Sequence, residues 1–162
     1  MQEVLCSESG QVFESSKIVA EIIAVCKSKN KGTRKESVES VIVKKDYGVI
    51  DDAHADCCTH RQVSLLAEES IDKMVNMGLK VGPGDFAENF TTKGIALVSL
   101  PVGTRLSLGE EVVLEVTQIG KDCHVGCAIF REVGKCIMPK EGVFARVVHG
   151  GLVRPGDQIA KT

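Results

Sequence analysis

Short apolar runs separated by glycines and charged turns make up most of the chain. Runs rich in β-branched residues occupy positions 17–26, 37–45, 95–100, 105–108, 112–119, 143–148 and 158–160. From residue 82 onward a glycine stands between most neighbouring runs. Short strands with regular glycine turns are typical of a barrel or sandwich. The pattern therefore predicts a mainly β fold with a few helices (α+β).

One segment, which begins after Ser64, favours a helix instead. Glu68 and Glu69 would stand in its first turn, where carboxylates suit the helix dipole, and Ser64 would be the N-cap. Gly78 is a suitable residue to end it. We expect this helix to pack on the sheet through Leu66, Met74 and Met77, which are more typical of core than of a metal site.

The remaining segments are interpreted as loops and an N-terminal segment. The basic stretch 27–35 is interpreted as a solvated hairpin loop rather than an anion site, because charge runs are usually solvated. Residues 1–16 show no period, so we expect a flexible segment there. The 162 residues contain no convincing linker, which predicts one domain over 17–162.

Composition narrows the function classes. The chain has 20 basic and 22 acidic side chains, 4% aromatic residues and no Trp. A nucleic-acid partner needs a basic face or stacking aromatics, so we expect none. No apolar run is long enough for a membrane span or a secretion signal. Seven cysteines without such a signal indicate reduced thiols and a cytoplasmic location rather than a disulfide framework.

The densest group of reactive side chains is Cys123, His124 and Cys127, followed by Cys136. The neighbouring Lys121 and His124 favour a thiolate at Cys123, which is the form that attacks electrophiles and binds metals. Three interpretations remain open: a reactive or metal-binding Cys123, a structural zinc site, and ordinary buried cysteines. In the first, Cys127 and Cys136 would tune or protect Cys123.

A second polar group, residues 51–61, contains two histidines, three aspartates and two cysteines. A metal site is one interpretation. We favour a polar connection whose aspartates bond to local backbone, because the spacing matches no defined metal motif.

Several motifs in a fixed order resemble the MOSC family, the domain named after the C-terminal part of molybdenum-cofactor sulfurase. They are Gly48-Val-Ile-Asp-Asp-Ala-His-Ala-Asp56, His60-Arg-Gln-Val-Ser-Leu-Leu66, Gly84-Asp-Phe-Ala-Glu-Asn-Phe-Thr-Thr92, Val102-Gly-Thr-Arg-Leu106, Leu114-Glu-Val-Thr-Gln118 and Cys136-Ile-Met-Pro-Lys-Glu-Gly-Val-Phe-Ala145. The last resembles small stand-alone bacterial members linked to molybdopterin biosynthesis. The likeness runs over about residues 18–160 and implies a MOSC-like β-barrel.

The resemblance also implies a function centred on the molybdenum cofactor (molybdopterin). The family cysteine, matched by Cys123, would carry or transfer sulfur as a persulfide or ligate molybdenum. Arg and Lys suit the pterin phosphate and raise thiolate character. The resemblance thus implies that the cofactor is bound by His54, His60, Arg61, Lys121 and Asn89.

The resemblance implies partners as well. Larger sulfurases of the family carry a pyridoxal-phosphate domain for which this chain has no room. A separate cysteine desulfurase would therefore load the sulfur, and molybdoenzymes or cofactor-biosynthesis proteins would receive it. The alternatives are a small molybdoenzyme that reduces N-hydroxylated compounds, a non-catalytic cofactor carrier, and a zinc-binding domain.

Two positions depart from the family pattern. The family commonly has Gly-Asp where this chain has Asp51-Asp52, and glycine where it has Asp56. We expect these aspartates to alter the loop over the cofactor site.

Overall fold

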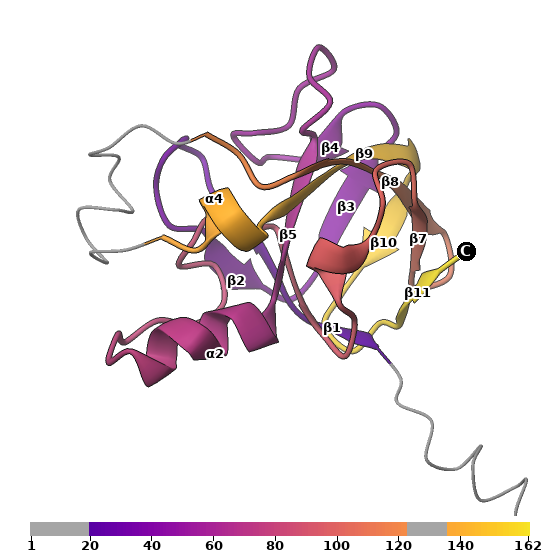
Figure 1. Ribbon diagram of the computed structural model, residues 1–162. Helices are drawn as coiled ribbons and strands as arrows, with labels where there is room; N and C mark the ends of the chain where they lie inside the picture. The colour runs from indigo at the N-terminus through magenta and orange to yellow at the C-terminus, as the bar shows by residue number, and fades with distance from the viewer. Residues whose placement is uncertain (1–19, 123–135) are drawn as a thin grey trace, which may run out of the picture.

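Two β-sheets form most of the protein in the computed structural model, which describes residues 20–122 and 136–162 (Figure 1). The main sheet has eight strands in the order β11-β7-β8-β9-β5-β6-β1-β2. Their bounds are β1 (Glu21–Lys27), β2 (Glu36–Val38), β5 (Val63–Ala67), β6 (Phe90–Lys93), β7 (Arg105–Leu108), β8 (Val112–Ile119), β9 (Val143–His149) and β11 (Ile159–Lys161). The smaller sheet has the order β10-β3-β4, with β10 (Gly151–Val153), β3 (Val41–Lys44) and β4 (Gly48–Val49).

The main sheet curls until its two ends approach each other. All its pairings are antiparallel except that of β5 with β6. Near the start of β1, the Ile22 amide donates to the Asp157 carbonyl over 2.8 Å, and the Gly156 amide donates to the Ile22 carbonyl over 2.7 Å. The Ile159 amide at the start of β11 also donates to the Ala20 carbonyl just before β1, and Glu21 and Gln158 form an isolated bridge, but β1 and β11 do not pair as neighbouring strands. The described strands therefore do not close into a barrel, while the predicted mainly β, α+β fold is confirmed.

The main core lies along alternating positions of these strands. In β8, Val112, Leu114 and Val116 are buried, and the residues between them are half-buried. This period of two matches the alternation of side chains across a sheet. The alternation explains why 105–108 and 112–119 were both predicted with their observed bounds, as β7 and β8.

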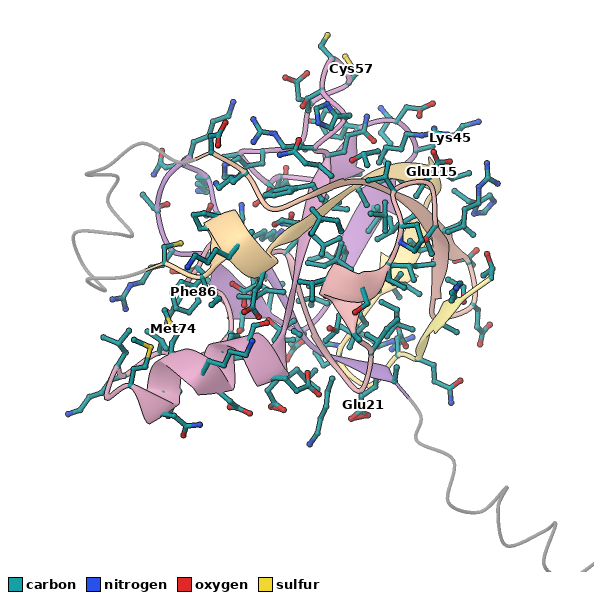
Figure 2. All side chains as sticks on the ribbon, in the orientation of Figure 1. Glu21, Lys45, Cys57, Met74, Phe86 and Glu115 are labelled. Atoms are coloured by element: carbon teal, nitrogen blue, oxygen red, sulfur yellow. The ribbon has the colours of Figure 1, made fainter. Side chains whose placement is uncertain are left out.

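A second apolar cluster lies under the helices α2 (Glu68–Asn76) and α4 (Met138–Glu141). Both helices lie on the same side of the main sheet in Figure 1. Figure 2 shows Met74 of α2 beside Phe86, and both belong to this cluster together with Leu66 of β5. Within the described residues, no helix has the length and apolar character needed to cross a bilayer.

The predicted helix begins later than expected. Ser64 and Leu66 belong to β5, whose five residues are all buried, and α2 starts at Glu68 with Ala67 as its N-cap. The Ser64 hydroxyl bonds to the Ala87 carbonyl instead of capping a helix. The expected end is confirmed, because Gly78 follows the C-cap with a φ of +96°. The assignment of Met77 to the core is wrong, since its side chain is 56% exposed.

One predicted strand is absent. Residues 95–100 contain the 3₁₀ turn η1 (Leu97–Ser99), and only Leu97 of that turn is buried. Its side chain inserts into the main core while its neighbours Val98 and Ser99 stay exposed. A short apolar run does not by itself distinguish a strand from a single buried turn.

We predict that Leu66→Ala lowers the free energy of unfolding by about 2–5 kcal/mol, because the side chain is fully buried in the cluster under the helices. Urea melts measure the loss. Met77→Ala is the matched control and should change stability by less than about 0.5 kcal/mol. Equal losses in the two variants would contradict this description of the helical face.

Candidate functional site

A cavity of about 500 Å³ is lined by residues from loops and strands far apart in the sequence. This volume falls within the range of small-molecule sites. The lining includes Lys31, His54, Arg61, Asn89, Lys121 and Phe144. Four of the five cofactor-binding residues suggested by the sequence therefore meet around one cavity.

A buried ion pair lies behind one wall of this cavity. Lys35 Nζ lies 2.6 Å from Asp52 Oδ1, and neither side chain is exposed. Burial by itself would raise the pKa of Asp52, but the hydrogen bond and charge of Lys35 outweigh it and hold that pKa below its usual value. Asp52 also accepts bonds from the backbone amides of Ser28 and His54. The carboxylate thus joins the β1–β2 connection to the β4–β5 connection.

The position of Lys35 depends on a tight backbone contact. The Lys35 amide donates to the Gly84 carbonyl over 2.8 Å, and a Cβ on Gly84 would lie 2.2 Å from the Lys35 carbonyl oxygen. Gly84 also has a φ of +87°, which favours glycine. Its amide donates to Oε2 of Glu88, whose complete burial raises the pKa of its carboxyl to about 7. The 27–35 segment is the predicted hairpin, but its last lysine is buried and not solvated.

Lys35 also determines how His54 faces the cavity. Lys35 Nζ lies 2.9 Å from His54 Nδ1. An ammonium group only donates hydrogen bonds, so Nδ1 is the acceptor, and a neutral ring then carries its proton on Nε2. Burial and the Lys35 charge lower the pKa of His54 to about 4. His54 thus lines the cavity as a neutral residue and adds no positive charge to it.

The lowered pKa of His54 makes stability depend on pH. Between pH 4 and about 6.5 the unfolded chain binds more protons at this ring than the folded chain does. The neutral His54 ring therefore costs the folded state no stability above about pH 6.5. The free energy of unfolding falls as the pH is lowered from there toward 4.

Two cations share one aromatic ring at the cavity. The guanidinium carbon of Arg61 lies 5.6 Å from the centre of the Phe144 ring, and Lys121 Nζ lies 5.8 Å from it. These distances are within the range of cation–π attraction. Lys31 adds a third cation to the lining, while Asp56 and Asp122 add two carboxylates. These three cations and two carboxylates give the lining a small net positive charge.

Asn89 lies in the lining but bonds to the protein on several sides. Its Oδ1 accepts from the amide of Ser64, and its Nδ2 donates to the Cys26 carbonyl. These bonds connect β5 with β1 at the cavity. His60 is placed differently: its Nε2 bonds to Oε1 of Gln118 over 2.7 Å, and it is not among the lining residues.

Cys123, His124 and Cys127 fall outside the described residues. The residues on either side of that segment are described, and both Asp122 and the half-buried Cys136 line the cavity.

The two departures from the family pattern have different effects. Asp51 adopts a φ of +70°, in the left-handed region where glycine is favoured and aspartate is tolerated. The backbone turn expected of a glycine is therefore kept. Asp56 places a carboxylate at the cavity, and its Oδ1 accepts the Cys58 amide over 2.8 Å. Asp52 and Asp56 thus bond to local backbone, as the preferred interpretation of 51–61 predicted.

Sequence reasoning missed Lys31, Lys35, Asp52 and Phe144 as residues of this site. Lys31 and Lys35 were assigned to a solvated charge run, and no local pattern distinguishes them from their neighbours. Asp52 did carry a signal, because it is the aspartate of the family's Gly-Asp pair.

The comparisons with known proteins agree with this architecture. The model of the MOSC domain family matches residues 51–160. The chain belongs to the MOSC domain family. The match begins in the β4–β5 connection, includes His54 and Arg61, and ends within β11. No curated protein matches this MOSC domain.

Solved structures share its fold at low sequence identity. The YUAD protein from Bacillus subtilis has a TM-score of 0.69 and 17% identity, over 88% of this chain and 94% of that chain. YiiM from Escherichia coli has a TM-score of 0.64 and 16% identity, over 90% and 70%. YiiM from Geobacillus stearothermophilus has a TM-score of 0.60 and 20% identity, over 90% and 74%. These likenesses confirm the fold, and the family membership confirms the resemblance found in the motifs.

We predict that the His54 ring stays neutral, with its proton on Nε2, from pH 8 down to about pH 5, and titrates near pH 4. Nitrogen-15 NMR of the imidazole measures both features, and His54→Gln identifies the signal. In urea the same ring should titrate near about 6.5. A folded-state titration near that value, or a proton on Nδ1, would contradict the role assigned to Lys35.

Proposed function

We propose that this MOSC domain binds the molybdenum cofactor in the cavity and handles its sulfur through Cys123. The observation that supports the proposal is the pair of cations, Arg61 and Lys121, held over Phe144 at the cavity. Guanidinium and ammonium groups suit a phosphate, and the cofactor's pterin carries one. The family itself is associated with this cofactor.

The donor groups of the cavity fit a phosphorylated pterin. Arg61, Lys121 and Lys31 would hold the phosphate, and neutral His54 would donate from Nε2 to a polar edge of the ring. Asp56 works against anion binding, because its carboxylate shares the lining. We therefore propose weaker cofactor retention than a glycine at this position would give.

Cys123 follows directly after Asp122, which lines the cavity. When bound, the cofactor would supply a molybdenum centre that accepts a soft sulfur ligand. Cys123 would carry the sulfur as a persulfide or bind the metal as a thiolate, and a separate pyridoxal-phosphate-dependent desulfurase would load it. Lys121, two residues before it, favours the thiolate.

One experiment separates phosphate binding from sulfur handling. The full chain and its variants are purified from a host that makes the cofactor, and pterin, molybdenum and sulfane sulfur per chain are measured. We predict that Arg61→Ala lowers pterin affinity by about 10- to 100-fold, since a charge-assisted hydrogen bond contributes about 1.5–3 kcal/mol. Cys123→Ser should keep the fold and the pterin, and lose molybdenum retention and persulfide loading.

Lys80→Ala is the control, because Lys80 is exposed and not among the lining residues. Cys26→Ser should leave sulfur loading intact. Equal pterin content in wild type and Arg61→Ala would contradict the placement of the phosphate beside Arg61. Equal sulfur loading in wild type and Cys123→Ser would remove the sulfur-transfer role, and equal molybdenum content would remove the ligand role.

A further inference from the structure

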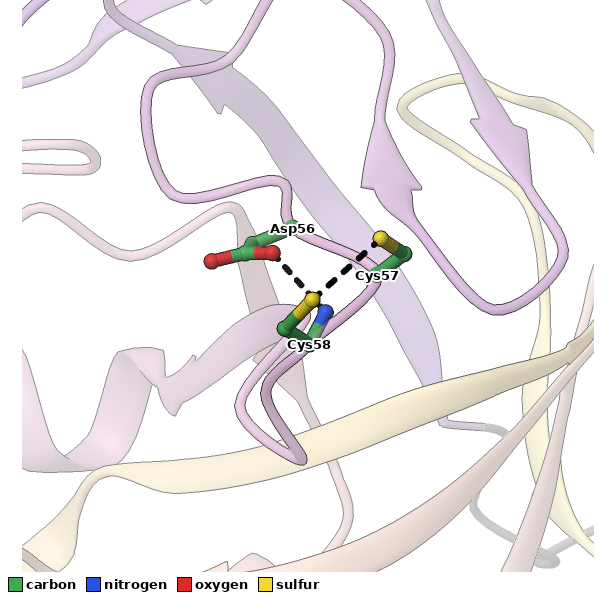
Figure 3. Close-up of side chains that lie close together, drawn as sticks. All are labelled: Asp56, Cys57 and Cys58. Atoms are coloured by element: carbon green, nitrogen blue, oxygen red, sulfur yellow. Dashed lines mark hydrogen bonds between the residues drawn. The ribbon is translucent and has the colours of Figure 1, made fainter.

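Three consecutive ligand-type side chains gather at the tip of the β4–β5 connection. Figure 2 shows Cys57 at the end of this loop, away from the sheets, and Figure 3 shows Asp56, Cys57 and Cys58 together. Both cysteines are exposed and in no disulfide. The loop is anchored at its base, because the Asp56 amide donates to the Tyr47 carbonyl over 2.9 Å. A backbone hydrogen bond therefore holds the first residue of the cluster in place.

The spacing of these atoms matches a tetrahedral metal site. The sulfur atoms of Cys57 and Cys58 lie 3.6 Å apart, and a carboxylate oxygen of Asp56 lies within 4.8 Å of both. Two sulfurs at about 2.3 Å from a tetrahedral Zn²⁺ are separated by about 3.8 Å. The observed separation is thus close to one edge of that tetrahedron. The two sulfurs therefore need little movement to hold one ion, and the carboxylate of Asp56 is the neighbouring third ligand.

The charges in the cluster also favour a cation. The carboxylate of Asp56 lies beside the two sulfurs, and a divalent cation would let both thiols lose their protons next to it. Thiolate ligands select soft or borderline ions such as Zn²⁺ over Mg²⁺ and Ca²⁺.

We propose that Asp56, Cys57 and Cys58 form a site for one thiophilic divalent cation of the Zn²⁺ class. The three side chains supply three ligands, and the fourth position stays open to water or to an incoming ligand. Because Asp56 also lines the cavity, the ion stands at its rim. On binding, each thiol gives its proton to the solvent and both sulfurs become thiolate ligands. The site does not depend on the cofactor proposal.

The test uses the full chain, freed of metal and kept reduced by a phosphine that does not compete as a thiol would. Zn²⁺ is titrated in competition with a chromophoric chelator, and Co²⁺ reports tetrahedral thiolate coordination by its visible and charge-transfer bands. We expect one ion per chain at this site, with about two protons released per ion. Magnesium in large excess should not compete.

Variants locate the ion. Mutating a residue that only hydrogen-bonds to a metal ligand already costs about 10- to 100-fold in metal affinity. Removing a ligand itself, by Cys57→Ser or Cys58→Ser, should therefore cost at least about 100-fold. Asp56→Asn should cost about 10-fold. Because both cysteines are exposed, thermal melts of the metal-free serine variants should match wild type.

The matched control is the triple variant Cys123→Ser/Cys127→Ser/Cys136→Ser, which should keep the ion with unchanged affinity. Loss of the ion in this variant, with retention in Cys57→Ser/Cys58→Ser, would assign zinc to the other cysteines and overturn the proposal. Failure of the reduced wild type to bind Zn²⁺ or Co²⁺ would overturn it as well.

Discussion

The buried ion pair between Lys35 and Asp52 is the interaction on which the rest of the cavity depends. Two opposite charges without solvent contact are stable only when each has further hydrogen bonds. Asp52 has them from the Ser28 and His54 amides, and Lys35 has one to the His54 ring. Removing one partner of such a pair costs about 3–5 kcal/mol, because the other charge stays buried and unpaired. The pair therefore fixes two loops and the ring between them.

This arrangement places a neutral ring beside the cations of the cavity. The charge of Lys35 is balanced by Asp52, and burial of the His54 ring together with the nearby Lys35 charge keeps that ring unprotonated, so His54 offers a hydrogen-bond donor without a charge. The positive charge comes from Arg61 and Lys121 over Phe144. A ligand with one anionic end and one polar ring fits both kinds of group. The proposed assignment of a phosphorylated pterin follows from this combination, and the proposed zinc-class site at the rim has only Asp56 in common with the lining.

Much of the fold was predictable, because side-chain alternation determines which residues form strands. The strands at 105–108 and 112–119 followed from it. The end of β5 was instead assigned to the helix, because Ser64 with Glu68 and Glu69 resembles a helix start, and a strand that is buried throughout has no alternation that would indicate a strand. The family motifs in the sequence were enough to indicate His54 and Arg61. The burial of Lys35 could not be predicted locally, since its partner lies 17 positions away and the pair forms only when the chain folds. The neutral state of His54 has the same origin.

Amide hydrogen exchange with and without a phosphorylated pterin tests the central claim that these joined loops form the ligand site. Ligand that binds the folded state suppresses the local opening through which amides exchange. The account predicts slower exchange at His54, Arg61 and Lys121 together, and at Ser28, whose amide bonds to Asp52. Amides of the β3–β10 pair should be unchanged. Protection confined to that smaller sheet, or none at saturating ligand, would contradict the account.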